Sequence, residues 1–160
     1  MIQRLEVVGL NYQFDYGLKF NPDLNIFTGS NGCGKTTLLK LMWYLISGNL
    51  HRIITEIPFE FVLIETDQFS FSMASSNDHK NRGDTLHLVW KFGTGEEKSA
   101  QIRRSRFLRN QTVLSLNARI ASVSQNSLFF PTFRRIEGGY SHFSRFVERL
   151  LVLSQLSVEG

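Results

Sequence analysis

Cysteine and proline are scarce in this 160-residue chain, which contains one cysteine, Cys33, and three prolines. A single cysteine excludes an intramolecular disulfide and a zinc site built from several cysteines. Long apolar runs are also missing, because none approaches the roughly 18 to 20 residues that span a bilayer, and the first residues lack the pattern of a signal peptide. We therefore expect a cytoplasmic protein with no membrane partner, which folds around one core without metal or disulfides.

Lysine is absent from residues 101–160, which contain nine arginines and three acidic residues and carry a net charge of +6. Residues 1–100 contain nine basic and eleven acidic residues, so the positive charge is concentrated in the last part of the chain. The densest group of arginines consists of Arg103, Arg104, Arg106 and Arg109. Such a group can contact phosphates or an acidic partner surface, and a solvated arginine-rich surface is the alternative.

Hydrophobic periodicity predicts the elements of the first part of the chain. Residues 2–10 are typical of a strand, with residues 16–20 as its hairpin partner and residues 24–28 as a short further strand. From Leu38 to Ile46 the apolar residues follow the spacing of a helix with one buried face.

In the middle of the chain the spacing of apolar residues changes to a period of two. Residues 59–105 alternate apolar and polar side chains, which predicts an antiparallel meander with one apolar face that includes Trp90 and Phe92. A further strand fits residues 118–124, and residues 143–156 predict a final helix.

A glycine-rich segment between the expected strand and helix matches the phosphate-binding pattern G-x-x-x-x-G-K-[ST]. Its residues are Gly29, Ser30, Asn31, Gly32, Cys33, Gly34, Lys35, Thr36 and Thr37. The glycines allow backbone conformations that let N–H groups point at an anion, and the helix N-terminus adds its dipole. Lys35 can reach the β- and γ-phosphates, and Thr36 can offer its hydroxyl to Mg²⁺. Cys33 occupies a variable position, where a tolerated small side chain is the main interpretation and a redox switch the alternative.

The residues from Ile26 to Leu39 resemble those of the ATP-binding cassette (ABC) ATPases, in particular the non-transporter heads. These include structural-maintenance-of-chromosomes proteins, recombination and repair ATPases, and ATPases of bacterial phage-defence systems. The resemblance implies an α/β P-loop NTPase fold, in which an N-terminal lobe combines a P-loop strand–helix unit with an antiparallel β-subdomain. It also implies ATP and Mg²⁺ as cofactors.

Residues 120–131 are interpreted as a strand that ends in Gln125 and is followed by Leu-Phe-Phe-Pro, which is similar to the Gln loop of that family. The resemblance implies that Gln125 contacts Mg²⁺ or the attacking water, so that Lys35 and Gln125 act in catalysis while Thr36 and Gln125 hold the metal. An ordinary loop glutamine is the alternative.

Three parts of a complete ABC ATPase do not appear after residue 125: the strand ending in Asp-Glu, the Ser-Gly-Gly signature loop and the switch histidine. Glu65 ends an apolar run but falls within the meander, so we interpret it as a strand end. We therefore expect residues 1–160 to form a single, incomplete ATP-binding domain. Its parts are a P-loop core (1–58), an antiparallel β-subdomain (59–124), and a Gln-loop-like segment with a helix (125–160).

The resemblance implies that the complete protein hydrolyses ATP to drive head dimerisation, coupled to a DNA- or nuclease-linked process such as phage defence or repair. The expected partners are the missing C-terminal lobe, a second head in a homodimer, and a nuclease or DNA. This chain alone should be inactive. Two alternatives are a nucleotide-gated switch module without turnover and a P-loop kinase of small substrates.

Overall fold

The computed structural model describes residues 1–76 and 84–124. The strands in these ranges are β1 (Ile2–Leu10), β2 (Phe14–Lys19), β3 (Phe61–Thr66), β4 (Phe69–Ser76), β5 (Thr85–Phe92) and β6 (Lys98–Arg103). The helices are α1 (Lys35–Ile46), α2 (Leu50–Glu56), α3 (Gln111–Val123) and the 3₁₀ helix η1 (Arg104–Arg109). Gln125, the Gln-loop-like segment and the expected helix at residues 143–156 lie outside the described residues.

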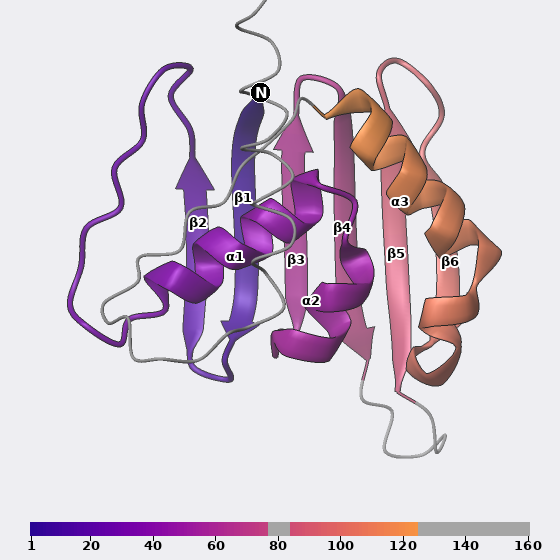
Figure 1. The fold of residues 1–160 in the computed structure, drawn as a ribbon, viewed down its shortest axis with the longest axis horizontal. Helices are drawn as coiled ribbons and strands as arrows, with labels where there is room; N and C mark the ends of the chain where they lie inside the picture. Colours follow the sequence, from indigo (N-terminus) through magenta and orange to yellow (C-terminus); the bar gives the residue numbers. More distant parts are fainter. Residues whose placement is uncertain (77–83, 125–160) are drawn as a thin grey trace, which may run out of the picture. The chain divides into compact units, whose positions relative to one another are not determined.

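The six strands form one antiparallel sheet in the order β2-β1-β3-β4-β5-β6 (Figure 1). The expected hairpin of β1 with β2 and the expected meander from β3 to β6 are confirmed. The structure joins them, because β1 pairs with β2 on one side and with β3 on the other. Leu5 lies opposite Leu18 in the first pair and opposite Ile64 in the second.

The helices cover one face of this sheet (Figure 1), and the core lies between the two layers. The predicted helix after the glycine-rich loop is confirmed as α1, which buries Leu38, Leu41 and Leu45. The apolar face of β5 is only partly enclosed: Leu86 and Leu88 are fully buried, while Trp90 and Phe92 are partly buried against the core. The α/β fold expected for the N-terminal lobe is therefore confirmed.

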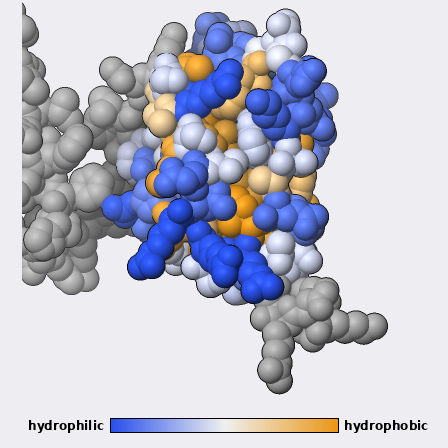
Figure 2. Space-filling model, turned by 90° about the vertical axis from the view of Figure 1, so that its right-hand side faces the viewer, coloured by the Kyte–Doolittle hydropathy of each residue, from blue (hydrophilic) through white to orange (hydrophobic). Residues whose placement is uncertain are grey.

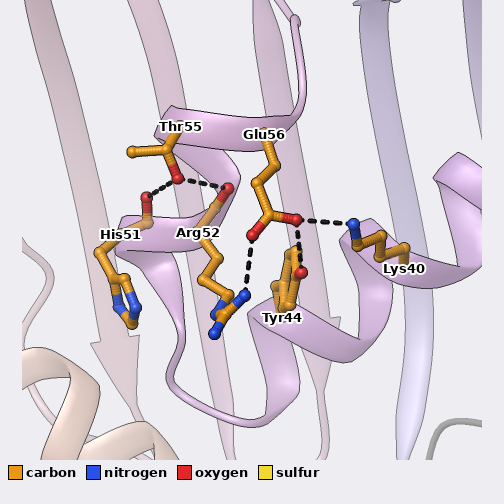
Figure 3. A network of polar contacts seen from close by, with 6 residues as sticks. All are labelled: Lys40, Tyr44, His51, Arg52, Thr55 and Glu56. Carbon is orange, nitrogen blue, oxygen red and sulfur yellow. Dashed lines mark hydrogen bonds and ion pairs between the residues drawn. The ribbon is translucent and has the colours of Figure 1, made fainter. Parts of the chain in front are cut away.

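Helix α2, which the sequence did not predict, is fastened to α1 through the carboxylate of Glu56 (Figure 3). Glu56 pairs with Lys40 Nζ at 2.6 Å, accepts a hydrogen bond from Tyr44 Oη at 2.7 Å, and pairs with Arg52 Nη1 at 2.9 Å. Partial burial alone would raise the pKa of Glu56, but these donors outweigh it and lower that pKa to about 2. The ionised carboxylate thus holds α2 against the helix that follows the glycine-rich loop.

The prediction of a strand at residues 118–124 is wrong, because these residues lie in or at the end of helix α3. The side chain of Asn110 caps this helix by accepting hydrogen bonds from two backbone N–H groups of the first turn, at 2.9 and 3.4 Å. Its buried residues are Val113, Leu116 and Ile120, whose separations of three and four are helical. The cap and this spacing together favour a helix over the expected strand.

The prediction of a strand at residues 24–28 is also wrong. A strand exists only through hydrogen bonds to a neighbouring backbone, and no strand of the described part of the chain pairs with this segment. Leu24 and Ile26 are accordingly 70% and 77% exposed. Of the predicted strand–loop–helix unit, the structure contains the loop and the helix.

Candidate functional site

The glycine-rich loop connects residues 24–28 to α1 at one end of the helix layer. Three of its glycines adopt positive φ angles: 153° at Gly29, 86° at Gly32 and 81° at Gly34. These conformations are strained for residues with a Cβ atom. Gly34 is also the N-cap of α1, so the loop ends directly at the helix N-terminus.

The first turn of α1 presents open backbone donors. Leu38 donates its N–H to the Gly34 carbonyl at 2.8 Å. The N–H groups of Lys35, Thr36 and Thr37 precede it in the helix and have no acceptor among the residues that the structure describes. Such donors at the positive end of a helix dipole favour an anion, and no acidic side chain in this turn opposes one.

The ammonium group of Lys35 lies against the loop that precedes it. Its Nζ donates to the carbonyl oxygens of Gly29 and Ser30, both at 2.7 Å, and contacts Cys33 Sγ at 3.5 Å. The loop therefore curves around a positive charge beside the open N–H groups of the helix. A phosphate in this curve would contact donors of both kinds.

The two threonines after Lys35 differ in their contacts. The Thr37 hydroxyl accepts a hydrogen bond from Asn11 Nδ2 at 3.4 Å. Thr36 is exposed, and its hydroxyl has no hydrogen-bond partner within the described ranges. An exposed hydroxyl next to a phosphate site is a suitable ligand for a hydrated Mg²⁺. The residues therefore fit a nucleotide with its metal, although residues 1–76 and 84–124 contain no group of three or more metal-binding side chains.

Two residues that the sequence did not single out, Asn11 and Tyr16, support the loop. The Tyr16 hydroxyl donates a hydrogen bond to the backbone carbonyl of Cys33. Partial burial and the proximity of Cys33 both raise the pKa of Tyr16, so it remains a donor at neutral pH. A Cβ atom at Gly34 would lie 3.5 Å from this hydroxyl, which places β2 directly beside the loop. No local pattern could reveal these contacts, because they join segments distant in sequence.

Glu65 lies near the end of β3 and opposite Arg4, whose guanidinium is 3.6 Å from its carboxylate. The interpretation of Glu65 as a strand end is thus confirmed. Cys33 is half-buried, and the redox alternative for its thiol stays a prediction. Within the described ranges, no helix combines the length and the apolar character that crossing a membrane requires.

The sheet with one helix-covered face and the glycine-rich loop opening α1 define a class of protein. A family model described as an AAA domain matches residues 12–136, which is most of the chain. The chain belongs to this family, and it is part of an ABC-type P-loop ATPase head that is not a transporter.

Two bacterial relatives are both named DNA replication and repair protein RecF. The protein of Paenarthrobacter aurescens (strain TC1) is 26% identical over 153 residues, which cover 94% of this chain and 35% of the relative. The protein of Renibacterium salmoninarum is 30% identical over 141 residues, which cover 87% of this chain and 31% of the relative. The chain spans about a third of the length of these curated relatives.

Proposed function

We propose that residues 29–37 bind ATP with Mg²⁺, and that this chain is the ATP-binding N-terminal lobe of an ABC-type ATPase. The observation that carries the proposal is the geometry of the loop: the Lys35 ammonium lies 2.7 Å from two loop carbonyls, and the N–H groups that open α1 have no acceptor among the described residues. A triphosphate supplies the negative charge that this arrangement favours.

Each residue of the loop has a role in this proposal. The backbone N–H groups of residues 29–37 surround the phosphates, while Lys35 neutralises charge on the β- and γ-phosphates. Thr36 would offer its hydroxyl oxygen to the metal, and Gln125 would contact the metal or the attacking water. The metal supplies charge neutralisation at the phosphates. Catalysis needs further groups, and we propose that they come from a C-terminal lobe and from a second head in a homodimer.

The domain organisation belongs to the same proposal: residues 1–160 form one incomplete ATP-binding domain, divided at residues 58 and 124. The name that both relatives share, DNA replication and repair protein RecF, supports a role in a DNA-linked process. Phage defence and a nuclease partner remain predictions, as does a cytoplasmic location. A switch module that binds ATP without turnover is the second candidate, since it needs only the phosphate-binding loop.

Nucleotide titration with the Lys35→Ala variant tests the proposal. We expect ATP to bind the variant about 10- to 100-fold more weakly, because charge-assisted hydrogen bonds contribute roughly 1.5–3 kcal/mol each. Lys91→Ala removes an exposed lysine on β5 as a matched control and should bind ATP as the wild type does. Equal ATP affinity of Lys35→Ala and the wild type would refute the P-loop assignment.

A steady-state ATPase assay separates the two candidates. The 160-residue chain alone should show almost no turnover, because one missing charge-stabilising group can reduce the rate by about 10³–10⁵. Restored turnover after addition of the C-terminal lobe supports the ATPase, whereas ATP binding that never leads to turnover supports the switch module.

A further inference from the structure

The four arginines between Arg103 and Arg109 do not share one environment. A 3₁₀ helix has three residues per turn, so side chains three positions apart lie above one another and the helix surface consists of three rows. In η1 the row that points inward begins at Arg104, continues with the fully buried Phe107 and ends at Asn110, the cap of α3.

The guanidinium of Arg104 is bonded to other residues of the fold. Its Nη1 pairs with Asp84 at 2.9 Å, and its Nη2 donates to the Ile54 carbonyl at 2.8 Å. This guanidinium therefore connects η1 to α2 and to the start of β5. Its charge is neutralised by Asp84, so it is unsuited to recognise an external anion.

The second row of η1 consists of arginine alone. Arg106 and Arg109 lie one turn apart in η1, and Arg103, the last residue of β6 and the N-cap of η1, precedes them at the same sequence interval. All three side chains are exposed, and no carboxylate of the described residues pairs with any of them. Arg106 and Arg109 are separated by about 6 Å along the helix, given a rise of about 2 Å per residue.

Figure 2 faces the β6 edge of the sheet, which is the side of the molecule that carries η1. The most hydrophilic side chains of that face gather at its lower end, where η1 lies in Figure 1. The only acidic side chain bonded to this helix within the described ranges is Asp84, which Arg104 neutralises. The arginine row thus presents uncompensated positive charge to solvent.

We propose that the arginine row, Arg103, Arg106 and Arg109, binds the phosphate backbone of a nucleic-acid strand. A guanidinium fork matches phosphate oxygens in two parallel hydrogen bonds, and three such forks without carboxylate partners complement the repeated charges of a strand. The inference rests on the DNA-linked part of the proposed function and assigns that contact to named residues.

The test measures binding of a fluorescein-labelled oligothymidylate by fluorescence anisotropy over a range of salt concentrations, without nucleotide. The variant R103Q/R106Q/R109Q removes the arginine row. The variant K19Q/K91Q/K98Q removes the same charge from three exposed lysines elsewhere on the sheet. Circular dichroism and ATP titration establish that both variants are folded and still bind nucleotide.

We expect the salt dependence, the slope of log K against log salt concentration, to fall by about 2 in R103Q/R106Q/R109Q, since each phosphate contact on a single strand contributes about 0.7. The lysine variant should keep the wild-type slope. An unchanged slope in the arginine variant, or an equal reduction in both variants, would overturn the proposal. So would displacement of the DNA by polyaspartate at the same concentration of negative charge, since that result identifies an acidic protein as an equally good partner.

The two proposals can fail separately. Loss of DNA binding in R103Q/R106Q/R109Q with ATP binding retained supports the arginine row independently of the P-loop. Wild-type protein that binds DNA in the expected way but binds no ATP refutes the proposed function and leaves the arginine row supported.

Discussion

The hydroxyl of Tyr16 donates a hydrogen bond to the backbone carbonyl of Cys33, a residue 17 positions further along the chain. Tyr16 lies on β2, in the sheet, whereas Cys33 lies in the glycine-rich loop. The bond fixes the backbone of the loop one residue before its last glycine, Gly34. The edge of the sheet therefore shapes the loop that we propose as the phosphate site.

Replacement of Tyr16 by Phe should weaken ATP binding roughly fivefold, because one net hydrogen bond contributes about 1 kcal/mol to the ordering of the loop. The aromatic ring remains, so the packing of β2 is kept. Isothermal titration calorimetry with ATP measures the effect, and Tyr12→Phe is the control because Tyr12 is 82% exposed. Unchanged affinity in Tyr16→Phe would show that the loop keeps its shape without this bond.

Replacement of Thr36 by Val should remove the increase in ATP affinity that Mg²⁺ causes. The exposed hydroxyl of Thr36 is the proposed metal ligand, and we expect a loss of at least about tenfold, the lower range for disturbed metal ligation. Titrations with Mg²⁺ and with a chelator separate metal-dependent from metal-independent affinity. Thr37→Val is the matched control, since the Thr37 hydroxyl is hydrogen-bonded to Asn11. Equal Mg²⁺ dependence in the two variants would contradict the assignment.

Replacement of Glu56 by Gln should lower the free energy of unfolding at neutral pH by about 1–2 kcal/mol, because hydrogen bonds to charged groups on a partly exposed site are only partly screened. Its pKa falls from 4.5 to about 2 on folding, so the ionised form stabilises the fold above pH 4.5. This contribution is lost as the pH falls from 4.5 toward 2. Urea unfolding across this range should show the wild type and the variant converge in acid. A constant difference would exclude ionisation of Glu56 as the cause.

Replacement of Gly48 by Ala should destabilise the fold by about 3 kcal/mol. Gly48 has a φ of 67°, which costs other residues about 1–2 kcal/mol. A Cβ atom there would also overlap the backbone carbonyl of Asn117 in α3. Gly93→Ala is the control, because Gly93 has a φ of 53° with open space around it and should lose only the conformational part. Equal losses in thermal unfolding would show that α3 moves aside without cost.

Several elements were determined by the sequence alone. The hairpin of β1 and β2, the meander from β3 to β6, and α1 follow from the periodicity of apolar residues, because burial of one face imposes a period of two on strands and of about 3.6 on helices. The glycine-rich loop was likewise recognisable, since its function depends on residue types at fixed positions within a short segment.

The tertiary structure decided the features that depend on partners distant in the chain. β1 pairs with β3 as well as with β2, and residues 24–28 form no strand because no described strand pairs with them. The core that α3 helps to cover favours a helix at residues 118–124. Tyr16 meets Cys33, and Arg104 turns inward while Arg103 turns outward, only once distant segments pack together. A local sequence pattern indicates which side chains prefer burial, whereas long-range packing determines which residues they are buried against.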